Sequence, residues 1–429
     1  MNKNDSERVA SVVEGLGYRE VSSQNKADLI IVNTCSIRDS AENRVFGQAR
    51  NWEELKKKNP KLTIAVTGCL PGRDKAGDLR EKLPVVDFFF PIKDLPELPN
   101  WLCGRFPELR MSGNLEKDYL KIRPKIVNTK QAWVTIISGC NNYCTFCVVP
   151  YSRGLEKSRE VKDILEEAKE LNEAGTIEIT LLGQNVNTFK PTDPEVFSKD
   201  NPYKDYFAAL LWELNQFSNL KRIHFTSPNP QDMTDEVIDA LALPKQMNIL
   251  HLPIQSGSER ILKKMNRKHT RDEYFSIIDK VNKRVPGIAL ATDIIIGFCS
   301  ETEKDFLDTV DLYKKVQFDI SYNAIYSPRS GTVAGRLWKD DIPEKEKKRR
   351  WDHLHNLMCD ITYKKNQQYK DRDISVMVEK SDKGFLWGHS SELKLVRMRG
   401  DTNLIGTIQP VRVKEAQTWQ LVGELQKKN

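Results

Sequence analysis

Three cysteines with the spacing C-x3-C-x2-C are the residues of this chain best suited to carry chemistry: Cys140, Cys144 and Cys147. Thiolates are soft ligands that bind the iron of iron–sulfur clusters. Three of them in one loop suit a [4Fe–4S] cluster in which one iron keeps an open coordination position. Such an iron can bind the amino and carboxylate groups of S-adenosylmethionine. The spacing therefore predicts a catalytic cluster rather than one that only carries electrons.

A structural zinc site is the alternative for these thiols. Such a site takes four ligands and usually draws them from two C-x2-C pairs. Cys144 and Cys147 would form one pair, but the sequence contains no second C-x2-C. The spacing thus favours the iron–sulfur cluster.

Two further cysteines, Cys35 and Cys69, each follow a short apolar run, at residues 29–32 and 62–66. We expect both runs to be buried strands of an open, doubly wound α/β domain that begins with an amphipathic helix near residues 9–16. In a parallel sheet both thiols would lie at the carboxyl edge, where such sheets bind ligands. A second metal site and two buried structural cysteines both remain open at this point.

The middle of the chain alternates between predicted strands and helices. The strands are expected near residues 132–137, 177–182, 221–226, 249–252, 288–296 and 318–326, and the helices near 160–174, 205–217, 234–243, 270–284 and 301–315. Six strands with five crossover helices predict a partial (β/α)6 barrel, with the cysteine loop at the carboxyl-end face that carries the chemistry of such barrels. Ser300 and Glu303 are expected to cap the last of these helices.

The C-terminal part changes character. Residues 343–368 form a predicted charged helix whose segment 344–350 should be a solvated face. From about residue 371 the apolar residues alternate with polar ones, and glycines separate short strands, which predicts a small β-barrel of a kind often used on nucleic acid. The expected division is 1–112, a linker at 113–131, 132–365 and 366–429.

Composition limits the class of protein. The chain has 429 residues, of which 39% are hydrophobic and 30% charged, and its net charge is +7. No apolar run approaches about 18 residues, so we expect no membrane span. Sparse cysteines favour a reduced, cytoplasmic setting. Most of the excess positive charge lies in residues 361–429, which suggests a polyanionic partner.

Several motifs resemble one family, the radical SAM methylthiotransferases, and in particular its MiaB type, which modifies isopentenyladenosine beside the anticodon of tRNA. The similar runs lie at residues 33–38 and 41–45, at Gly68-Cys69, and at 138–154, 181–187, 251–258 and 292–298. Residues 415–419 and 423–424 are similar to a TRAM domain, an RNA-binding barrel. The resemblance covers essentially the whole chain.

The resemblance implies two [4Fe–4S] clusters and two uses of S-adenosylmethionine, as radical source and as methyl donor. The first cluster would be held by Cys140, Cys144 and Cys147, and the auxiliary cluster, which supplies the sulfur, by Cys35 and Cys69. It also implies tRNA as substrate, methylthio transfer to C2 of the adenine, a flavodoxin- or ferredoxin-like electron donor and a monomeric enzyme. Candidate contacts with S-adenosylmethionine are Phe146, Gln184, Gln255, Ser256 and Asp293, although an ordinary core or loop-capping role is open for each.

The chain departs from the family pattern in three places. Met1-Asn2 aligns with the last two letters of a C-Q-M-N motif, so the third cysteine of the auxiliary cluster would fall before Met1, and the expected first strand is missing. We therefore expect an incomplete auxiliary ligand set and impaired methylthio transfer by the chain as given. Cys299 and Ser330 each stand where the family usually has proline.

The tRNA backbone is expected to lie on basic residues of the C-terminal barrel: Lys394, Arg397, Arg399, Arg412 and Lys414. Trp419 is expected to be a core residue more readily than a base-stacking one. Two alternatives to the main interpretation are a tRNA-binding paralogue with impaired catalysis and a radical SAM methylthiotransferase for another substrate.

Overall fold

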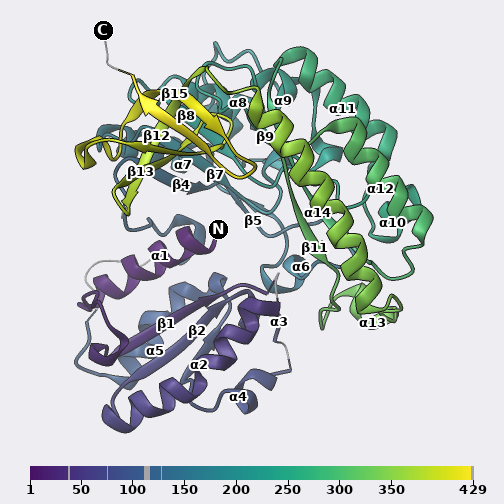
Figure 1. Cartoon of the computed structure of the whole chain (residues 1–429). Helices are drawn as coiled ribbons and strands as arrows, with labels where there is room; N and C mark the ends of the chain where they lie inside the picture. The colour runs from purple at the N-terminus through teal and green to yellow at the C-terminus, as the bar shows by residue number, and fades with distance from the viewer. Residues whose placement is uncertain (37–38, 75, 111–115, 127, 427–429) are drawn as a thin grey trace.

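The computed structural model describes residues 1–36, 39–74, 76–110, 116–126 and 128–426 (Figure 1). Its N-terminal part is a parallel sheet in the order β1-β2-β3, which confirms the strands expected near residues 29–32 and 62–66. The strands are β1 (Leu29–Thr34), β2 (Thr63–Gly68) and β3 (Phe88–Phe90), and the helices of this part are α1 (Asn2–Gly15), α2 (Asp39–Lys58), α3 (Cys69–Arg73), α4 (Asp78–Lys82) and α5 (Leu98–Arg105).

The central strand β2 is buried along its whole length because apolar clusters cover both faces of the sheet. On one face, Val12 of α1 and Leu98 of α5 pack with Ala65. On the other, Trp52 of α2 packs with Ile64. This is the doubly wound arrangement that the sequence predicts.

The predicted linker packs against the N-terminal helix. Residues 111–115 and 127 lie outside the described residues. Within the remainder, Tyr119 and Leu120 are buried beside Val9 and Val12 of α1. The Tyr119 hydroxyl donates a hydrogen bond to the carboxylate of Asp5. The segment therefore contributes to the core between α1 and the sheet.

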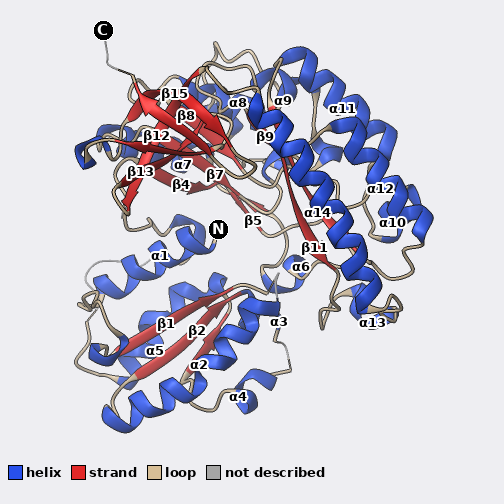
Figure 2. Cartoon of the chain, in the orientation of Figure 1, coloured by secondary structure: helices blue, strands red, loops and turns tan. Residues whose placement is uncertain are grey.

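The middle of the chain forms the predicted partial barrel as two three-stranded parallel half-sheets, β4-β7-β8 and β9-β10-β11 (Figure 2). An isolated parallel bridge pairs Ile223 of β8 with Gln246, which precedes β9. The strands are β4 (Gln131–Thr135), β7 (Glu178–Leu182), β8 (Arg222–Phe225), β9 (Ile249–His251), β10 (Ala289–Ile296) and β11 (Ile320–Ile325), all six at the expected places. The short strands β5 (Ile137–Ser138) and β6 (Lys157–Ser158) pair beside the cysteine loop.

Helices cover the outside of this half-barrel, and one apolar core joins them to the strands. The five expected helices are α7 (Val161–Glu173), α8 (Tyr206–Asn215), α9 (Asp235–Ala240), α11 (Arg271–Arg284) and α12 (Glu303–Val316). The short helices α6 (Val149–Ser152), α10 (Glu259–Lys264) and α13 (Val333–Leu337) carry no strong periodicity, and the sequence did not predict them.

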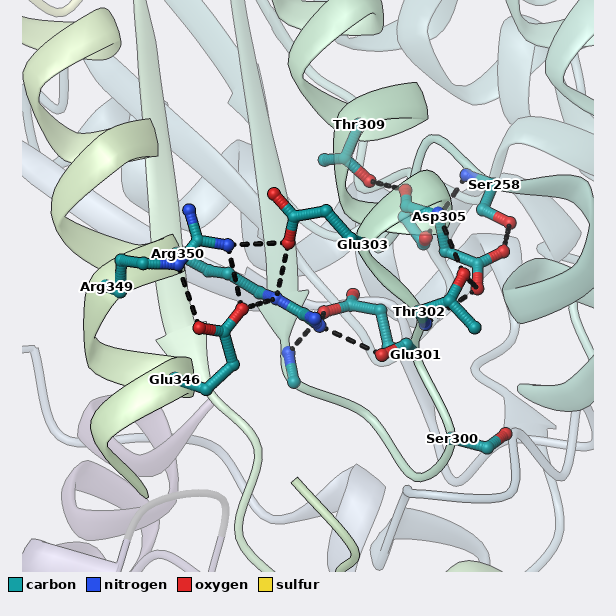
Figure 3. Close-up of polar contacts among 12 residues, drawn as sticks. Ser258, Ser300, Glu301, Thr302, Glu303, Asp305, Thr309, Glu346, Arg349 and Arg350 are labelled. Carbon is teal, nitrogen blue, oxygen red and sulfur yellow. Dashed lines mark hydrogen bonds and ion pairs between the residues drawn. The ribbon is translucent and has the colours of Figure 1, made fainter. Parts of the chain in front are cut away.

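The expected cap of α12 is wrong by two residues. Thr302, not Ser300, is the N-cap, and its side chain forms a capping box with Asp305 (Figure 3). Ser300 adopts a left-handed backbone conformation with φ 66°, which places it in the preceding turn. The same three-residue spacing occurs at both positions, and only the backbone geometry separates them.

The expectation that segment 344–350 is a solvated face is wrong for two of its residues. In α14 (Glu344–Gln367), the side chain of Lys347 is fully buried and lies 2.6 Å from Asp340. Arg350 is buried as well, with Glu301 at 2.8 Å (Figure 3). The side chains of Lys347 and Arg350 hold α14 against the open edge of the half-barrel, beside β11.

The C-terminal part is a closed barrel in the order β12-β13-β14-β16-β15, as the alternation of apolar residues predicts. Its strands are β12 (Asp373–Asp382), β13 (Phe385–Ser390), β14 (Leu395–Arg399), β15 (Ile408–Ala416) and β16 (Leu421–Leu425). Arg222 of β8 donates to the backbone oxygens of His389 and Ser375, which joins the two barrels. None of the helices in the described ranges combines the length and apolar character of a membrane span.

Candidate functional site

The cysteine loop follows β5 at the carboxyl end of the half-barrel. Gly139 starts the loop with φ 79°, and a Cβ there would meet the backbone oxygen of Leu155 at 2.1 Å, so only glycine fits. The backbone N–H of Thr145 donates to the oxygen of Met265 at 3.0 Å. Asn266 donates to the backbone oxygens of Asn142 and Tyr143. These bonds fasten the loop to the residues that follow α10.

The three thiols of this loop lie close enough to influence one another. The pKa of Cys140 is raised to about 11, mainly because the thiol is buried and in smaller part because of the neighbouring Cys144. Burial also raises the pKa of Cys147 to about 12, with additional contributions from Cys144, Cys140 and Cys69. Thiols with pKa values this high are protonated at neutral pH, so binding of iron would release their protons.

Hydrogen-bond donors are already directed at these sulfur atoms. Arg267 lies with Nη1 3.7 Å from the Cys144 Sγ, and the backbone N–H of Val149 donates to the Cys147 Sγ at 3.4 Å. Such donors stabilise cluster thiolates. Within the described ranges no group of three or more His, Cys, Asp or Glu side chains is placed to hold one metal ion. The three soft thiols of the loop and the donors beside their sulfur atoms fit the ligands of an iron–sulfur cluster.

Cys35 and Cys69 lie where the sequence predicts, at the carboxyl ends of β1 and β2. Cys35 comes one residue after β1, and Cys69 begins α3. Thr34 joins the two strand ends, since its hydroxyl donates to the Thr67 oxygen at 2.6 Å and accepts from the Leu70 N–H at 3.2 Å. The eight cysteines all lie among the described residues, and none of them is in a disulfide bond.

The N-terminal part faces the cysteine loop directly. Asp5 of α1 and Arg153, just beyond the loop, form an ion pair of 2.5 Å in which both side chains are buried. Burial lowers the pKa of Arg153, but Asp5 and Cys69 outweigh it, and the net shift is upward. In addition, α3 packs on α6 so closely that a Cβ at Gly72 would meet the Ser152 oxygen at 2.2 Å. The Cys69 edge of the sheet and the cysteine loop are therefore neighbours.

One cavity of about 750 Å³ opens at this junction. Its lining comes from the cysteine loop, the edge after β1 and the carboxyl ends of the barrel strands. It includes Ser36, Phe146, Cys147, Gln255, Asp293, Tyr322, Tyr326, Arg329, Trp351 and His355. A volume of this size matches sites for nucleoside-sized ligands.

The predicted contacts with S-adenosylmethionine divide into three groups. Phe146, Gln255 and Asp293 line the cavity. Gln184 lies at the start of the cysteine loop, where its Oε1 accepts from the Gly139 N–H at 2.8 Å. Ser256 is fully buried and accepts from the Ser258 N–H at 3.2 Å, so it is not brought to the cavity lining. The binding roles of these residues stay predictions.

Two expectations for the C-terminal barrel are wrong. Lys394 is buried and forms an ion pair of 2.8 Å with the equally buried Asp319, so it does not present its charge to solvent. Trp419 is 49% exposed and not a core residue. Of the other basic residues, Arg399 and Lys414 are exposed, Arg412 pairs with Asp373, and Arg397 lies over the ring of Phe385.

Sequence reasoning missed several residues of the site: Arg267, Trp351, His355 and the pair Asp5–Arg153. Trp351 and His355 stand in a charged helix and lack a recognisable motif. Arg153 lies in the run 138–154 that resembles the family, and this run was the available signal. The pairing of Arg153 with Asp5 depends on long-range packing.

Comparison with known proteins agrees with this geometry. Residues 134–313 match the Radical SAM superfamily, and residues 1–91 match a family described as uncharacterized protein family UPF0004. The tRNA-2-methylthio-N(6)-dimethylallyladenosine synthase of Thermoanaerobacter sp. (strain X514) is 40% identical over 99% of this chain and 90% of its own length. The enzyme of the same name from Carboxydothermus hydrogenoformans is 39% identical over 99% of this chain and 97% of its own.

Among solved structures, the radical S-adenosylmethionine methyltransferase TsrM from Kitasatospora setae superimposes with a TM-score of 0.53 at 12% identity, over 78% of this chain and 67% of that one. This likeness concerns the fold alone. The superfamily match makes an iron–sulfur cluster and S-adenosylmethionine the cofactors of the chain. From its identity to the two relatives over nearly its whole length, we conclude that the chain belongs to the tRNA-2-methylthio-N(6)-dimethylallyladenosine synthase family.

Proposed function

We propose that this chain is a tRNA methylthiotransferase that adds a methylthio group to C2 of N6-dimethylallyladenosine (isopentenyladenosine) beside the anticodon. One observation carries the proposal: Ser36, next to Cys35, and Cys147 line the same cavity. A reaction that needs both a radical source and a sulfur donor needs their two sites to face one substrate. The names of the relatives support the same activity.

Cys140, Cys144 and Cys147 are the residues that would hold the first cluster. When bound, the cluster and S-adenosylmethionine supply the electron, the radical and the methyl group, chemistry that side chains cannot provide. The protein holds the thiolates in place, with Arg267 beside Cys144 as the charged donor. Phe146, Gln184, Gln255 and Asp293 are the proposed contacts with S-adenosylmethionine, and the fully buried Ser256 is not among them.

Cys35 and Cys69 would supply two of the three thiolates that the family pattern gives the proposed auxiliary cluster, so methylthio transfer should be slower than formation of 5′-deoxyadenosine. This role of the two cysteines is supported by their position at adjacent strand ends and by the close packing of α3, which begins at Cys69, on α6 beside the cysteine loop. The sulfur for the methylthio group would come from this side of the cavity.

The cavity suits a base removed from the RNA stack. Phe146, Tyr322 and Tyr326 supply aromatic walls, and Gln255 and Asp293 supply polar groups. Enzymes that modify a base in a loop take it into such a pocket. The tRNA backbone would lie on Arg397, Arg399, Arg412 and Lys414 of the C-terminal barrel. A flavodoxin- or ferredoxin-like reductant, a monomeric enzyme and a cytoplasmic location stay predictions.

The test is anaerobic reconstitution with iron and sulfide, followed by reaction with tRNA that carries N6-dimethylallyladenosine. Mass spectrometry of the digested tRNA should detect the 2-methylthio nucleoside, and 5′-deoxyadenosine should form in parallel. Binding of tRNA and formation of 5′-deoxyadenosine, with no change in any tRNA nucleoside, would indicate a catalytically impaired paralogue. Methylthio transfer to a nucleoside other than N6-dimethylallyladenosine would indicate another substrate.

A further inference from the structure

A stack of three aromatic rings leads out of the cavity along α14. Trp351 and His355 stand one helical turn apart, with ring centroids 4.6 Å apart and ring planes inclined by 10°. The His355 ring also stacks on Trp419 of the C-terminal barrel, at 6.0 Å and 25°. Trp351 and His355 line the cavity, and Trp419 is 49% exposed. The stack thus runs from the cavity to solvent.

The outer ring is held in place by the turn that carries it. This turn, residues 417–420, joins β15 to β16 and closes with a hydrogen bond from the Gln417 N–H to the Gln420 oxygen. Asn366 of α14 donates to the oxygens of Gln417 and Thr418 at 2.8 and 3.0 Å. The inner ring is fixed too, since the Trp351 Nε1 donates to the Asn323 oxygen at 3.0 Å.

A hollow of about 370 Å³ lies beside the outer end of the stack. Its lining includes Tyr363, Lys370, Lys414 and Glu415, together with the two residues that precede Trp419. Aromatic rings beside lysines are the combination that binds single-stranded RNA, in which bases stack on rings and cations contact phosphates. An exposed tryptophan held rigidly at such a place has no role in the core.

We propose that Trp419 and His355 form a binding site for an unstacked nucleobase of the RNA strand that flanks the target nucleotide. The target base enters the cavity, and a neighbouring base of the same strand lies on the outer face of the stack. The site would accept either a purine or a pyrimidine, because stacking needs only a π-face. This inference rests on the proposed function, from which it takes the RNA.

The experiment is a mutant cycle between protein and RNA. Binding of a short RNA stem-loop with N6-dimethylallyladenosine in its loop is measured for the unaltered chain and for Trp419→Ala, Trp419→Phe and His355→Ala. Each is also measured with loops in which one nucleotide flanking the modified adenosine is abasic. Tyr206→Ala is the matched control. Tyr206 is an exposed aromatic residue at the start of α8, on the outer layer of the half-barrel, and it stacks on Phe197.

We expect Trp419→Ala to weaken binding on the order of tenfold, the usual effect of losing one stacked base. Trp419→Phe should restore most of the affinity. The loop that lacks the stacking base should bind equally well to the unaltered chain and to Trp419→Ala. Only loops that retain this base should quench the fluorescence of Trp419. Tyr206→Ala should bind like the unaltered chain.

The inference would be overturned if, at every abasic position, the loss of RNA affinity from Trp419→Ala simply added to the loss from the missing base. The proposed function would remain intact. Failure of the unaltered chain to bind any stem-loop would overturn both. Cleavage of S-adenosylmethionine is measured in parallel, and its loss in Trp419→Ala would also contradict the inference, since the stack should act only on the RNA.

Discussion

Arg350 of α14 and Glu301 of the turn between β10 and α12 form a buried ion pair, with Nη1 2.8 Å from Oε2 (Figure 3). The same Nη1 donates to the backbone oxygen of Glu301, and the Glu301 carboxylate accepts from the Gly297 N–H at 2.9 Å. This pair joins the long helix that carries Trp351 and His355 to the end of a barrel strand. The cavity wall therefore depends on a charge pair inside the protein.

Glu301→Gln should lower the free energy of unfolding by about 3 kcal/mol, because it leaves the Arg350 guanidinium buried without its charged partner. Thermal and denaturant unfolding measure the loss. Glu303→Gln is the control, since Glu303 is half-exposed, pairs with Arg349 at the surface, and lies 3.6 Å from the buried Arg350, farther than Glu301 does. If the two substitutions lowered the free energy of unfolding equally, the buried pair would contribute no more to stability than the contacts of Glu303.

Thr302→Ala should destabilise the protein by about 1 kcal/mol, the usual loss for an N-cap side chain. The Thr302 hydroxyl is in the capping box with Asp305, whose pKa is lowered because hydrogen bonds from Arg260, Ser258 and Thr302 outweigh its burial. Asp305 should be ionised at neutral pH, so the loss should be the same from pH 6 to 8. A larger effect from Ser300→Ala would favour the cap expected from sequence.

Alanine at Cys147 and alanine at Cys69 should have different effects. Cys147→Ala should abolish formation of 5′-deoxyadenosine, because the cluster that binds S-adenosylmethionine needs all three thiolates of its loop. Cys69→Ala should retain this cleavage but lower the iron content of the auxiliary site and abolish methylthio transfer. Cys359→Ala, in α14, is the control and should keep the iron content unchanged. Iron analysis and product mass spectrometry distinguish the three.

Arg267→Gln should lower the reduction potential of the first cluster. A positive donor beside the Cys144 sulfur stabilises the reduced, more negative state, and its removal favours the oxidised state. Potentiometric titration followed by electron paramagnetic resonance measures the potential directly. Arg271→Gln is the control, because Arg271 pairs with Asp308 and Asp311 on α12. An unchanged potential would mean that Arg267 only shapes the loop.

Lys414→Ala and Lys394→Ala should separate a tRNA contact from a structural cation. Lys414 is exposed, so its loss should weaken tRNA binding and reduce the slope of log Kd against log salt by about 0.7 to 0.9. Lys394 pairs with the buried Asp319, so its loss should lower stability instead. A change in salt slope for Lys394→Ala, with stability unaltered, would restore the expectation from sequence.

The sequence alone determined the chemistry and most of the elements. Spacing is local, so Cys140, Cys144 and Cys147 predict their cluster without a fold, and apolar periodicity predicts the six barrel strands and the C-terminal barrel. The tertiary structure decided the features that depend on which surfaces pack together. The sequence predicts that the charge run of α14 is solvated, but the structure buries Lys347, which pairs with Asp340, and Arg350, which pairs with the buried Glu301. The sequence predicts that Lys394 contacts phosphate, but the structure pairs it with the buried Asp319. The stack from His355 to Trp419 joins residues far apart in the chain, and only packing of the barrel on α14 brings their rings together.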